Sequence, residues 1–146
     1  MKKYAFQGPP YTISRDLLAE LHAVTPSESQ PLIADLFETI TLWENRAISA
    51  TPRDLGGGRY EVTLKVSARK LRADEVGRQT EVPMDDLVDI GVFGAKETPL
   101  YLARQRVRSG ESTITVQVTG RPEKAGIDPV NKLIDREPGD NLVDVK

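Results

Sequence analysis

The residues of this chain that could do chemistry are one histidine and two groups of carboxylates. His22 is the single histidine among 146 residues, and there is no cysteine. A catalytic zinc site takes three protein ligands, mostly histidines, and keeps one position open. The chain has no H-E-x-x-H pair, and no serine-centred elbow that His22 could serve as a base. We therefore predict a solvent-exposed His22, and no catalytic residue, metal site or cofactor site in this chain.

The carboxylates lie before an expected strand and in the C-terminal tail. Three aspartates fall between residues 85 and 89, and four more are Asp128, Asp135, Asp140 and Asp144. Calcium prefers oxygen ligands, but neither group follows the spacing of the helix-loop-helix calcium loop. We interpret Asp85 and Asp86 as capping or turn residues before a strand over residues 87–92. A small enzyme that uses paired carboxylates across a cleft remains an alternative.

Basic residues also gather in one place. Arg104, Arg106 and Arg108 alternate along an expected strand, so their side chains share one face. The chain has 20 Lys and Arg against 22 Asp and Glu, and no aromatic residues are interleaved with these arginines, so nucleic acid is not an expected partner. We predict an outer strand face with ion pairs to Glu61 or Glu111, with contact to an acidic partner surface as the alternative.

The first 45 residues have the hydrophobic period of helices. Leu17, Leu18, Leu21 and Val24 recur at helical spacing, and a second apolar stripe runs from Leu32 to Trp43. Pro31 cannot donate a helical hydrogen bond and predicts a kink or a restart at Ser29. We expect a helical hairpin over residues 1–45, at the end of an upstream helical region. Phe37 and Trp43 are expected to pack between its second helix and a β core.

After Arg46 the hydrophobic period changes from 3.6 to 2. Apolar residues alternate with polar ones from Tyr60 to Ala68, and Gly56-Gly57-Gly58 predicts a hairpin turn before them. Several further alternating segments follow without intervening helices, which indicates an antiparallel sandwich. We predict an α+β, mainly β fold, with an immunoglobulin-like β-sandwich over residues 46–146. Changes of phase predict β-bulges near Arg69 and Ala103, and the tail predicts short edge strands and a loose C-terminus.

Large aromatic residues supply the candidates for an interface. Tyr4, Phe6 and Tyr11 flank Pro9-Pro10, which has little sequence of its own to pack against. Exposed apolar groups of this kind mark partner surfaces. We therefore name Tyr4, Phe6, Tyr11 and Trp43 as candidate interface residues. No apolar run approaches the ~20 residues of a membrane-spanning helix, so we expect no direct membrane insertion by this chain.

Four stretches carry a resemblance to a known family. They are Phe6–Tyr11, Leu36–Leu42, Tyr60–Leu64 and Gly126–Arg136. In them the chain resembles the C-terminal segment of bacterial membrane proteins that fuse an ABC-transporter-like permease to an aminopeptidase N-like zinc metallopeptidase. The resemblance covers nearly the whole chain from Tyr4. In that family the zinc ligands and the general-base glutamate lie upstream, so no catalytic or metal-binding role carries over to a residue of this chain.

The resemblance implies a non-catalytic accessory domain of a membrane-linked zinc aminopeptidase. Its partners would be the peptidase and permease parts of the parent polypeptide, and zinc would belong to the parent. The chain would be a soluble fragment of a membrane-anchored bacterial protein, on the extracytoplasmic side. The alternative is a free-standing β-sandwich that binds protein or carbohydrate.

Overall fold

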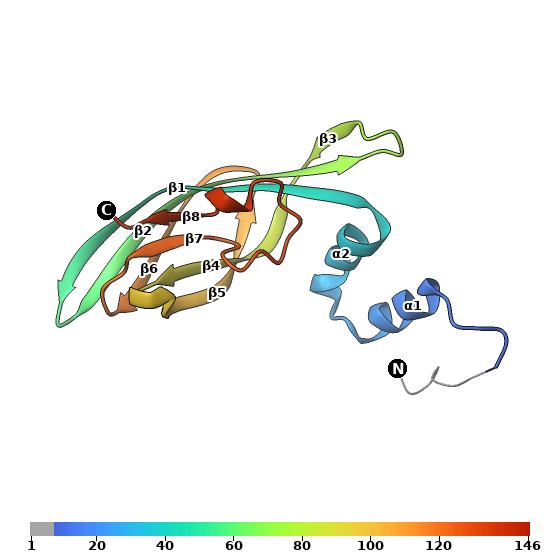
Figure 1. Cartoon of the computed structure of the whole chain (residues 1–146), viewed down its shortest axis with the longest axis horizontal. Helices are drawn as coiled ribbons and strands as arrows, with labels where there is room; N and C mark the ends of the chain where they lie inside the picture. The colour runs from blue at the N-terminus through green and yellow to red at the C-terminus, as the bar shows by residue number, and fades with distance from the viewer. Residues whose placement is uncertain (1–7) are drawn as a thin grey trace. The chain divides into compact units, whose positions relative to one another are not determined.

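The computed structural model describes residues 8–146 and is mainly β, with two antiparallel sheets and two short helices (Figure 1). The chain divides after Ile40 into two compact units. We call residues 8–40 the helical unit and residues 41–146 the β unit. Among residues 8–146, no helix combines the length and the apolar composition that crossing a membrane requires.

The helical unit consists of α1 (Ser14–Val24), a 3-10 turn η1 (Ser27–Ser29), α2 (Gln30–Ile33) and a π-helical turn η2 (Ala34–Glu38). At the start of α1, the carboxylate of Asp16 in the first turn accepts the backbone N–H of Ile13, the residue before the helix, at 2.9 Å. The helix α2 starts directly after Ser29 with Pro31 in its first turn, so the predicted restart is confirmed.

The second helical segment ends earlier than predicted, and the expected helix from Ile40 to Asn45 is wrong. Strand β1 begins at Ile40, and the Thr39 N–H closes the π turn on the Ala34 carbonyl at 3.0 Å. Residues 39–41 are all β-branched, which disfavours further helix. Beyond them the burial alternates with period 2, with Trp43 and Asn45 facing inward.

Sheet A is built around a long central strand. It contains β1 (Ile40–Gly56), β2 (Arg59–Ala73), β3 (Gln79–Val82) and β6 (Gly110–Thr119), and β2 pairs with all three others. The β1–β2 turn is made by glycines with positive φ, as the glycine triplet predicts. On its other side β2 pairs first with β6 and then, from Lys70, with β3.

Sheet B has the order β5-β4-β7-β8. Its strands are β4 (Asp85–Phe93), β5 (Pro99–Arg108), β7 (Lys124–Ile127) and β8 (Leu142–Asp144), with short 3-10 turns η3 (Ala95–Glu97) and η4 (Pro138–Asp140) in the connections. Because β7 lies between β4 and β8, it is an interior strand, whereas β8 at the end of the sheet is a short edge strand, as the tail predicts. The C-terminus is tied down as well, since the Lys146 N–H donates to the Ala50 carbonyl at 2.9 Å.

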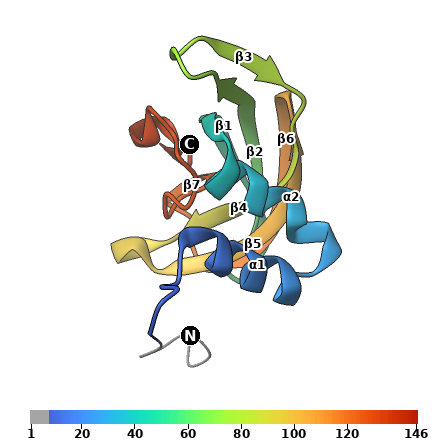
Figure 2. The same ribbon diagram turned by 90° about the vertical axis from the view of Figure 1, so that its right-hand side faces the viewer.

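The chain passes from one sheet to the other at two corners. One corner is Pro83-Met84, between β3 and β4, and the other is Ser109, between β5 and β6. The Met84 N–H donates to the Ser109 hydroxyl at 2.9 Å, and the Ser109 N–H donates to the Met84 carbonyl at 3.3 Å. The two corners therefore hold each other, and the sheets enclose a common core (Figure 2). Its fully buried side chains include Val62, Leu64, Val66, Val88, Ile90, Val92, Val107 and Ile127.

The predicted β-bulge near Ala103 is wrong. The β4–β5 register runs without interruption from Asp85–Arg108 to Val92–Tyr101, and its irregularity lies at Phe93. The sequence suggested that Leu102 faces the core, but Leu102 is exposed. Tyr101, Gln105 and Val107 share the inner phase instead, and the Gln105 amide donates to the Tyr101 hydroxyl at 2.8 Å. Near the other predicted bulge, at Arg69, the consecutive residues Lys70 and Leu71 are both buried. At this point β2 changes its partner from β6 to β3.

Candidate functional site

The densest set of polar interactions lies where residues 128–141 cross the β unit. Asp128 is buried, has φ 42°, and accepts the backbone N–H groups of Lys132 at 3.0 Å and Leu133 at 2.9 Å. The Asp128 carboxylate thus closes a turn over residues 128–133, as aspartates do. This turn begins the segment 128–141, which we call the loop. Burial raises the pKa of Asp128, against the opposing effect of these two N–H groups.

This loop is fastened to both sheets. Lys132 Nζ lies 2.5 Å from the buried carboxylate of Asp89 on β4, and Arg104 on β5 approaches the same carboxylate at 3.8 Å. On the other side, the Asp135 carboxylate accepts the Asn45 N–H at 2.9 Å, and the Ile134 carbonyl accepts the Trp43 N–H at 2.9 Å. Residues 132–135 therefore have a structural role, since they join β1 to β4.

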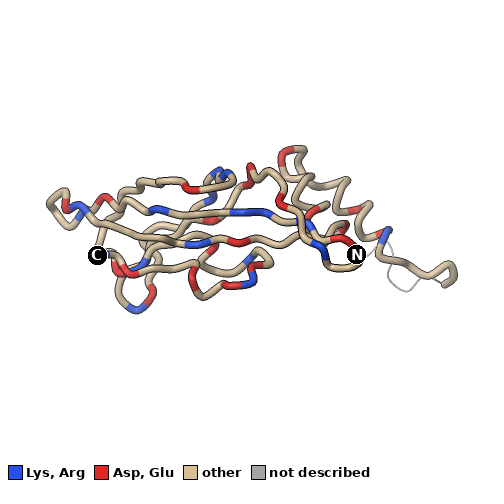
Figure 3. Tube along the Cα trace, turned by 90° about the horizontal axis from the view of Figure 1, so that it is seen from above, with Lys and Arg blue, Asp and Glu red and all other residues tan. Residues whose placement is uncertain are grey.

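A polar pocket of about 490 Å³ lies beside this loop. Its walls come from β1, β2 and the loop, and are lined by Glu44, Asn45, Arg46, Ser67, Arg69, Asp135, Arg136, Glu137 and Asp140. Glu44 binds both Arg69, at 2.8 Å, and Arg136, while Arg69 also contacts Glu81 at 2.9 Å. The pocket thus has both signs of charge, largely paired with each other. Figure 3 shows basic and acidic residues interspersed along the β unit.

Two side chains at this pocket are not satisfied within the protein. Both polar atoms of the buried Asn45 amide and one carboxylate oxygen of Asp140 are buried without a hydrogen-bond partner. Burial raises the pKa of Asp140, while the cation of Arg46, 3.7 Å away, opposes this shift. Groups of this kind are often satisfied by internal water. The lining contains no histidine, cysteine or lysine, and among residues 8–146 no group of three or more His, Cys, Asp or Glu side chains could hold a metal ion.

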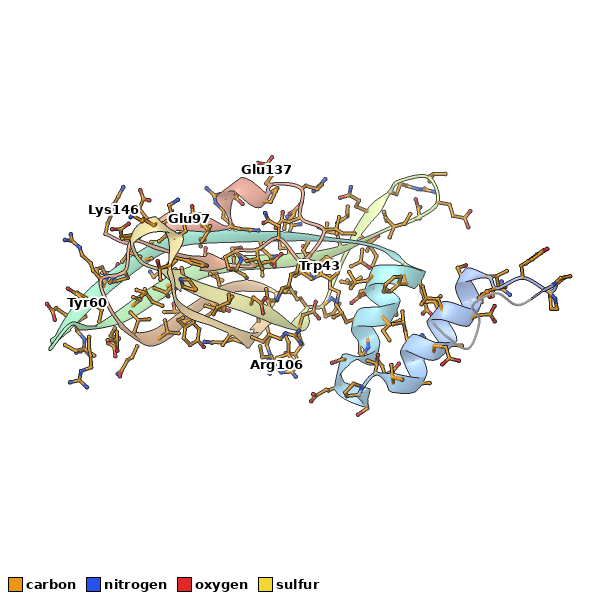
Figure 4. The ribbon with its side chains drawn as sticks, turned by 60° about the horizontal axis from the view of Figure 1, so that its bottom comes forward. Trp43, Tyr60, Glu97, Arg106, Glu137 and Lys146 are labelled. Carbon is orange, nitrogen blue, oxygen red and sulfur yellow. The ribbon has the colours of Figure 1, made fainter. Side chains whose placement is uncertain are left out.

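A second buried polar cluster joins the two sheets at Trp43. The Trp43 indole N–H donates to the Asp86 carboxylate at 3.1 Å, and Lys70 Nζ lies 3.0 Å from both oxygens of the same group. Lys70 is 5% exposed, and its Nζ lies 5.8 Å from the centroid of the indole ring. A buried ammonium needs such compensation. Figure 4 shows Trp43 among the strands of the β unit.

The described interface candidates, Tyr11 and Trp43, differ in their exposure to solvent. Tyr4 and Phe6 lie outside the described residues. Tyr11 is 75% exposed, whereas Trp43 has no exposed surface and offers none to a partner. Phe37 also differs from expectation, because it is 57% exposed and not part of a core. Trp43 belongs to the core because β1, and not a helix, carries it.

The acidic and basic residues of β4 and β5 pair across the strands. Asp85 faces Arg108 in the register and contacts Arg106 and Arg108 at 3.5 and 3.3 Å. The three arginines of β5 are exposed, as the outer-face interpretation predicts, and Figure 4 shows Arg106 pointing away from the strands. Their partners are Asp85 and Asp89 on the neighbouring strand, so the predicted pairing with Glu61 or Glu111 is wrong. Glu61 pairs with Arg53 at 2.7 Å instead.

His22 has a defined position within the helical unit. The Gln30 amide nitrogen donates to the carbonyls of His22 and Thr25 at 2.8 and 2.7 Å, which fixes the Gln30 side-chain oxygen as an acceptor. His22 Nδ1 donates to that oxygen at 2.5 Å, and Nε2 faces a carboxylate oxygen of Glu38 at 3.3 Å. Only the protonated ring donates on both sides. The hydrogen bond to Gln30, followed by that to Glu38, raises the pKa of His22 above 6.5.

We expect the His22 ring to titrate above pH 6.5 in the folded chain, and closer to 6.5 when Glu38→Gln removes the carboxylate. Because the folded-state pKa is raised, protonation stabilises the helical unit fully below about pH 6.5, and this contribution is lost as pH rises through the folded-state pKa. An NMR titration of the imidazole Cε1–H signal measures both values, since the chain has one histidine. A midpoint at or below 6.5 in the unmodified chain would contradict the geometry.

Sequence reasoning did not assign several residues of these clusters their structural roles. Lys70 carried a readable signal, because it continues the inward phase of Val66 and Ala68. Asp128 also carried one, since an Asp-Pro pair with an Asn two residues after the proline is typical of a turn. Asn45 carried none, because its burial depends on the loop that crosses β1.

Comparison with known proteins gives no relative for this chain. No family model matches it, and neither a curated protein nor a solved structure does.

Proposed function

We propose that the chain is a non-catalytic accessory domain, and that its helical unit docks on the peptidase part of a membrane-linked zinc aminopeptidase. In this proposal α1 and α2 form the docking hairpin, and the two sheets are an immunoglobulin-like sandwich that holds the peptidase in position. The identity of the parent rests on the resemblance of the four sequence stretches. The peptide hydrolysis and the zinc belong to the parent, which the permease part anchors in a bacterial membrane.

The observation that carries this proposal is the apolar surface of the helical unit. No residue of α1 is buried, although the helix has the apolar spacing of one that packs on a partner. Exposed apolar side chains of the unit are Tyr11, Ile13, Leu17, Val24, Leu32, Phe37 and Ile40. Exposed apolar groups gathered on one short segment mark an interaction surface.

The β unit supports a role in binding and positioning more than one in catalysis. Its buried polar groups are used for cohesion, since Asp86 holds Lys70 and Trp43, and Asp89 holds Lys132. Three carboxylates of the pocket, those of Glu44, Asp135 and Asp140, also face arginines or a backbone N–H group. No histidine of the pocket lining stands beside Ser67, the one hydroxyl of that lining, to activate it as a nucleophile.

The test uses the longer polypeptide that the resemblance implies, with Tyr11→Ala and Phe37→Ala combined. We expect limited proteolysis to release the β unit faster, because the exposed aromatic contacts to the peptidase are lost, while the isolated chain unfolds at an unchanged urea concentration. Leu102→Ala is the matched control, since Leu102 is similarly exposed but lies on β5.

Two outcomes would overturn the docking role. One is a reading frame around these 146 residues without an upstream H-E-x-x-H sequence. The other is a double variant whose proteolysis and aminopeptidase rate both equal those of the unmodified polypeptide.

A further inference from the structure

Strand β6 is an open edge of sheet A. Within the described part of the chain it pairs only with β2, from Arg59–Thr119 to Ala68–Gly110. Figure 2 shows β6 at the margin of its sheet, with β2 and then β1 to one side of it. The N–H and C=O groups along its other side have no strand partner in the sheet. An edge of this length is a template for pairing with another chain.

The free backbone groups of β6 belong to its odd-numbered residues. The Gly120 N–H donates to the Gly58 carbonyl at 2.8 Å, so residue 120 faces β2. In an antiparallel pair, the direction of the backbone groups alternates from one residue to the next. Thr113, Thr115, Gln117 and Thr119 therefore point their N–H and C=O groups away from β2, and their side chains are exposed on the outer face.

The sequence of β6 lacks the features that normally block an edge. Residues 112–120 read S-T-I-T-V-Q-V-T-G, with no charge and no proline, and most of them are β-branched. Natural edge strands carry lysine or proline, contain bulges, are very short, or are covered. The sequence of β6 has the composition of a strand that pairs on both sides.

The other edges of the β unit are protected. Along β5, Arg104, Arg106 and Arg108 would meet one another in a two-fold pairing, and like charges opposite each other repel. The outer side of β1 contacts the tail through bridges of Trp43 with Asp135 and of Ala50 with Val145. β3 and β8 are only four and three residues long. Among the strands of the β unit, only β6 combines length and exposure with an uncharged run, residues 112–119.

We propose that two copies of this chain pair through antiparallel β6 strands, related by a two-fold axis at Val116, into one continuous sheet. The occupant is a second copy because β6 is complementary to itself in this register. Thr115 then lies opposite Gln117, and Thr113 opposite Thr119. Glu111 falls beside the bend at Gly120 and Arg121, just beyond the end of β6 in the other copy. Opposite charges therefore lie near both ends of the pairing, and its centre carries none.

This register also agrees with the faces of the sheet. Every opposed pair joins two odd or two even residues, so outer side chains meet outer side chains and the apolar inner face continues across the axis. The odd residues exchange the hydrogen bonds, because their backbone groups are the free ones. Val116 becomes a non-hydrogen-bonded pair with itself, with Cα atoms about 4.5 Å apart.

The first test compares two double variants at the same positions. Thr115→Lys with Gln117→Lys puts lysine opposite lysine twice, whereas Thr115→Lys with Gln117→Glu puts lysine opposite glutamate twice. We expect sedimentation velocity over about 1–200 µM to show a monomer–dimer equilibrium for the unmodified chain. The Lys/Lys variant should weaken it by ~tenfold or more, and the Lys/Glu variant should stay within ~threefold.

The second test uses the absence of cysteine from the chain. Val116→Cys should form a covalent dimer on mild oxidation, because the Cα separation of a non-hydrogen-bonded pair suits a disulfide. Thr63→Cys is the control, since Thr63 lies opposite Thr115 on β2, one strand away from the edge. Thermal melts establish that each variant remains folded.

The proposal is overturned if the unmodified chain stays monomeric over that concentration range. It is also overturned if the two double variants weaken association equally, or if Thr63→Cys crosslinks as well as Val116→Cys. None of these outcomes bears on docking by the helical unit, because the test uses only β6 and the chain by itself.

Discussion

Replacing Trp43 by alanine is expected to lower the free energy of unfolding by about 3–5 kcal/mol. Trp43 is completely buried, so its removal leaves a large cavity between the strands. The indole N–H is also a donor to Asp86, and the ring faces the ammonium of Lys70. The alanine variant therefore loses apolar contact and weakens the environment of a buried ion pair at once.

The conservative variant separates these two contributions. Trp43→Phe keeps an aromatic face toward Lys70 but removes the donor to Asp86, so we expect a cost of about 1–3 kcal/mol. Ile48→Ala is the control on the same strand, because Ile48 is exposed and should change stability by less than about 1 kcal/mol. Urea unfolding followed by circular dichroism measures all three. A Trp43→Ala cost equal to that of Ile48→Ala would show that Trp43 is not a core residue.

Trp43 also illustrates why the sequence misplaced the end of the helical unit. Ile33, Leu36, Phe37, Ile40 and Trp43 recur at helical spacing, so the apolar residues alone continue the helix. In the structure the inward phase of β1 contains Thr41, Trp43 and Asn45. Because two of these three inward residues are polar, the sequence does not show the alternation of apolar and polar residues that would indicate a strand. The β-branched residues at 39–41 were the local signal for a strand.

The same effect explains the register of β5. Gln105 is inward and Leu102 is outward, so hydrophobicity gave the opposite phase and an unnecessary bulge. Where inward residues are apolar, as in β2 from Val62 to Ala68, the strand, its turn and its buried face could all be predicted. Sequence periodicity identifies a buried face only when the polar members of that face are few.

The candidate site was less predictable than the fold because it is assembled from distant segments. The pocket brings β1, β2 and the tail together, and its contacts between Asn45 and Asp135 join residues far apart in the chain. Local composition suggested that the tail is loose, since it contains prolines, glycines and aspartates. In the structure those aspartates accept backbone N–H groups, so the same composition builds an ordered loop.

Replacing Gly126 by alanine is expected to destabilise the β unit by about 3 kcal/mol or more. A Cβ atom on Gly126 would lie 1.9 Å from the backbone oxygen of Asn141, and that oxygen also accepts the Ile127 N–H at 3.0 Å. A backbone oxygen cannot relieve the clash by a rotamer change, as a flexible side chain could. The residues around Asn141, including β8, would therefore have to move away from β7. The ordered tail, including its contacts with β1, would be weakened as a consequence.

Gly139→Ala is the matched control in the same segment, because nothing lies within 4 Å of its Cβ position. We expect that variant to stay within about 1 kcal/mol of the unmodified chain, or to gain slightly from reduced flexibility of the unfolded state. Urea melts give the two free energies, and amide exchange of Val145 and Lys146 reports whether the tail detaches, since their N–H groups are bonded to Glu123 and Ala50. If Gly126→Ala unfolds at the same urea concentration as Gly139→Ala, the close crossing of the tail over β7 is wrong. If it unfolds earlier and exposes those amides, the crossing explains why this position requires glycine.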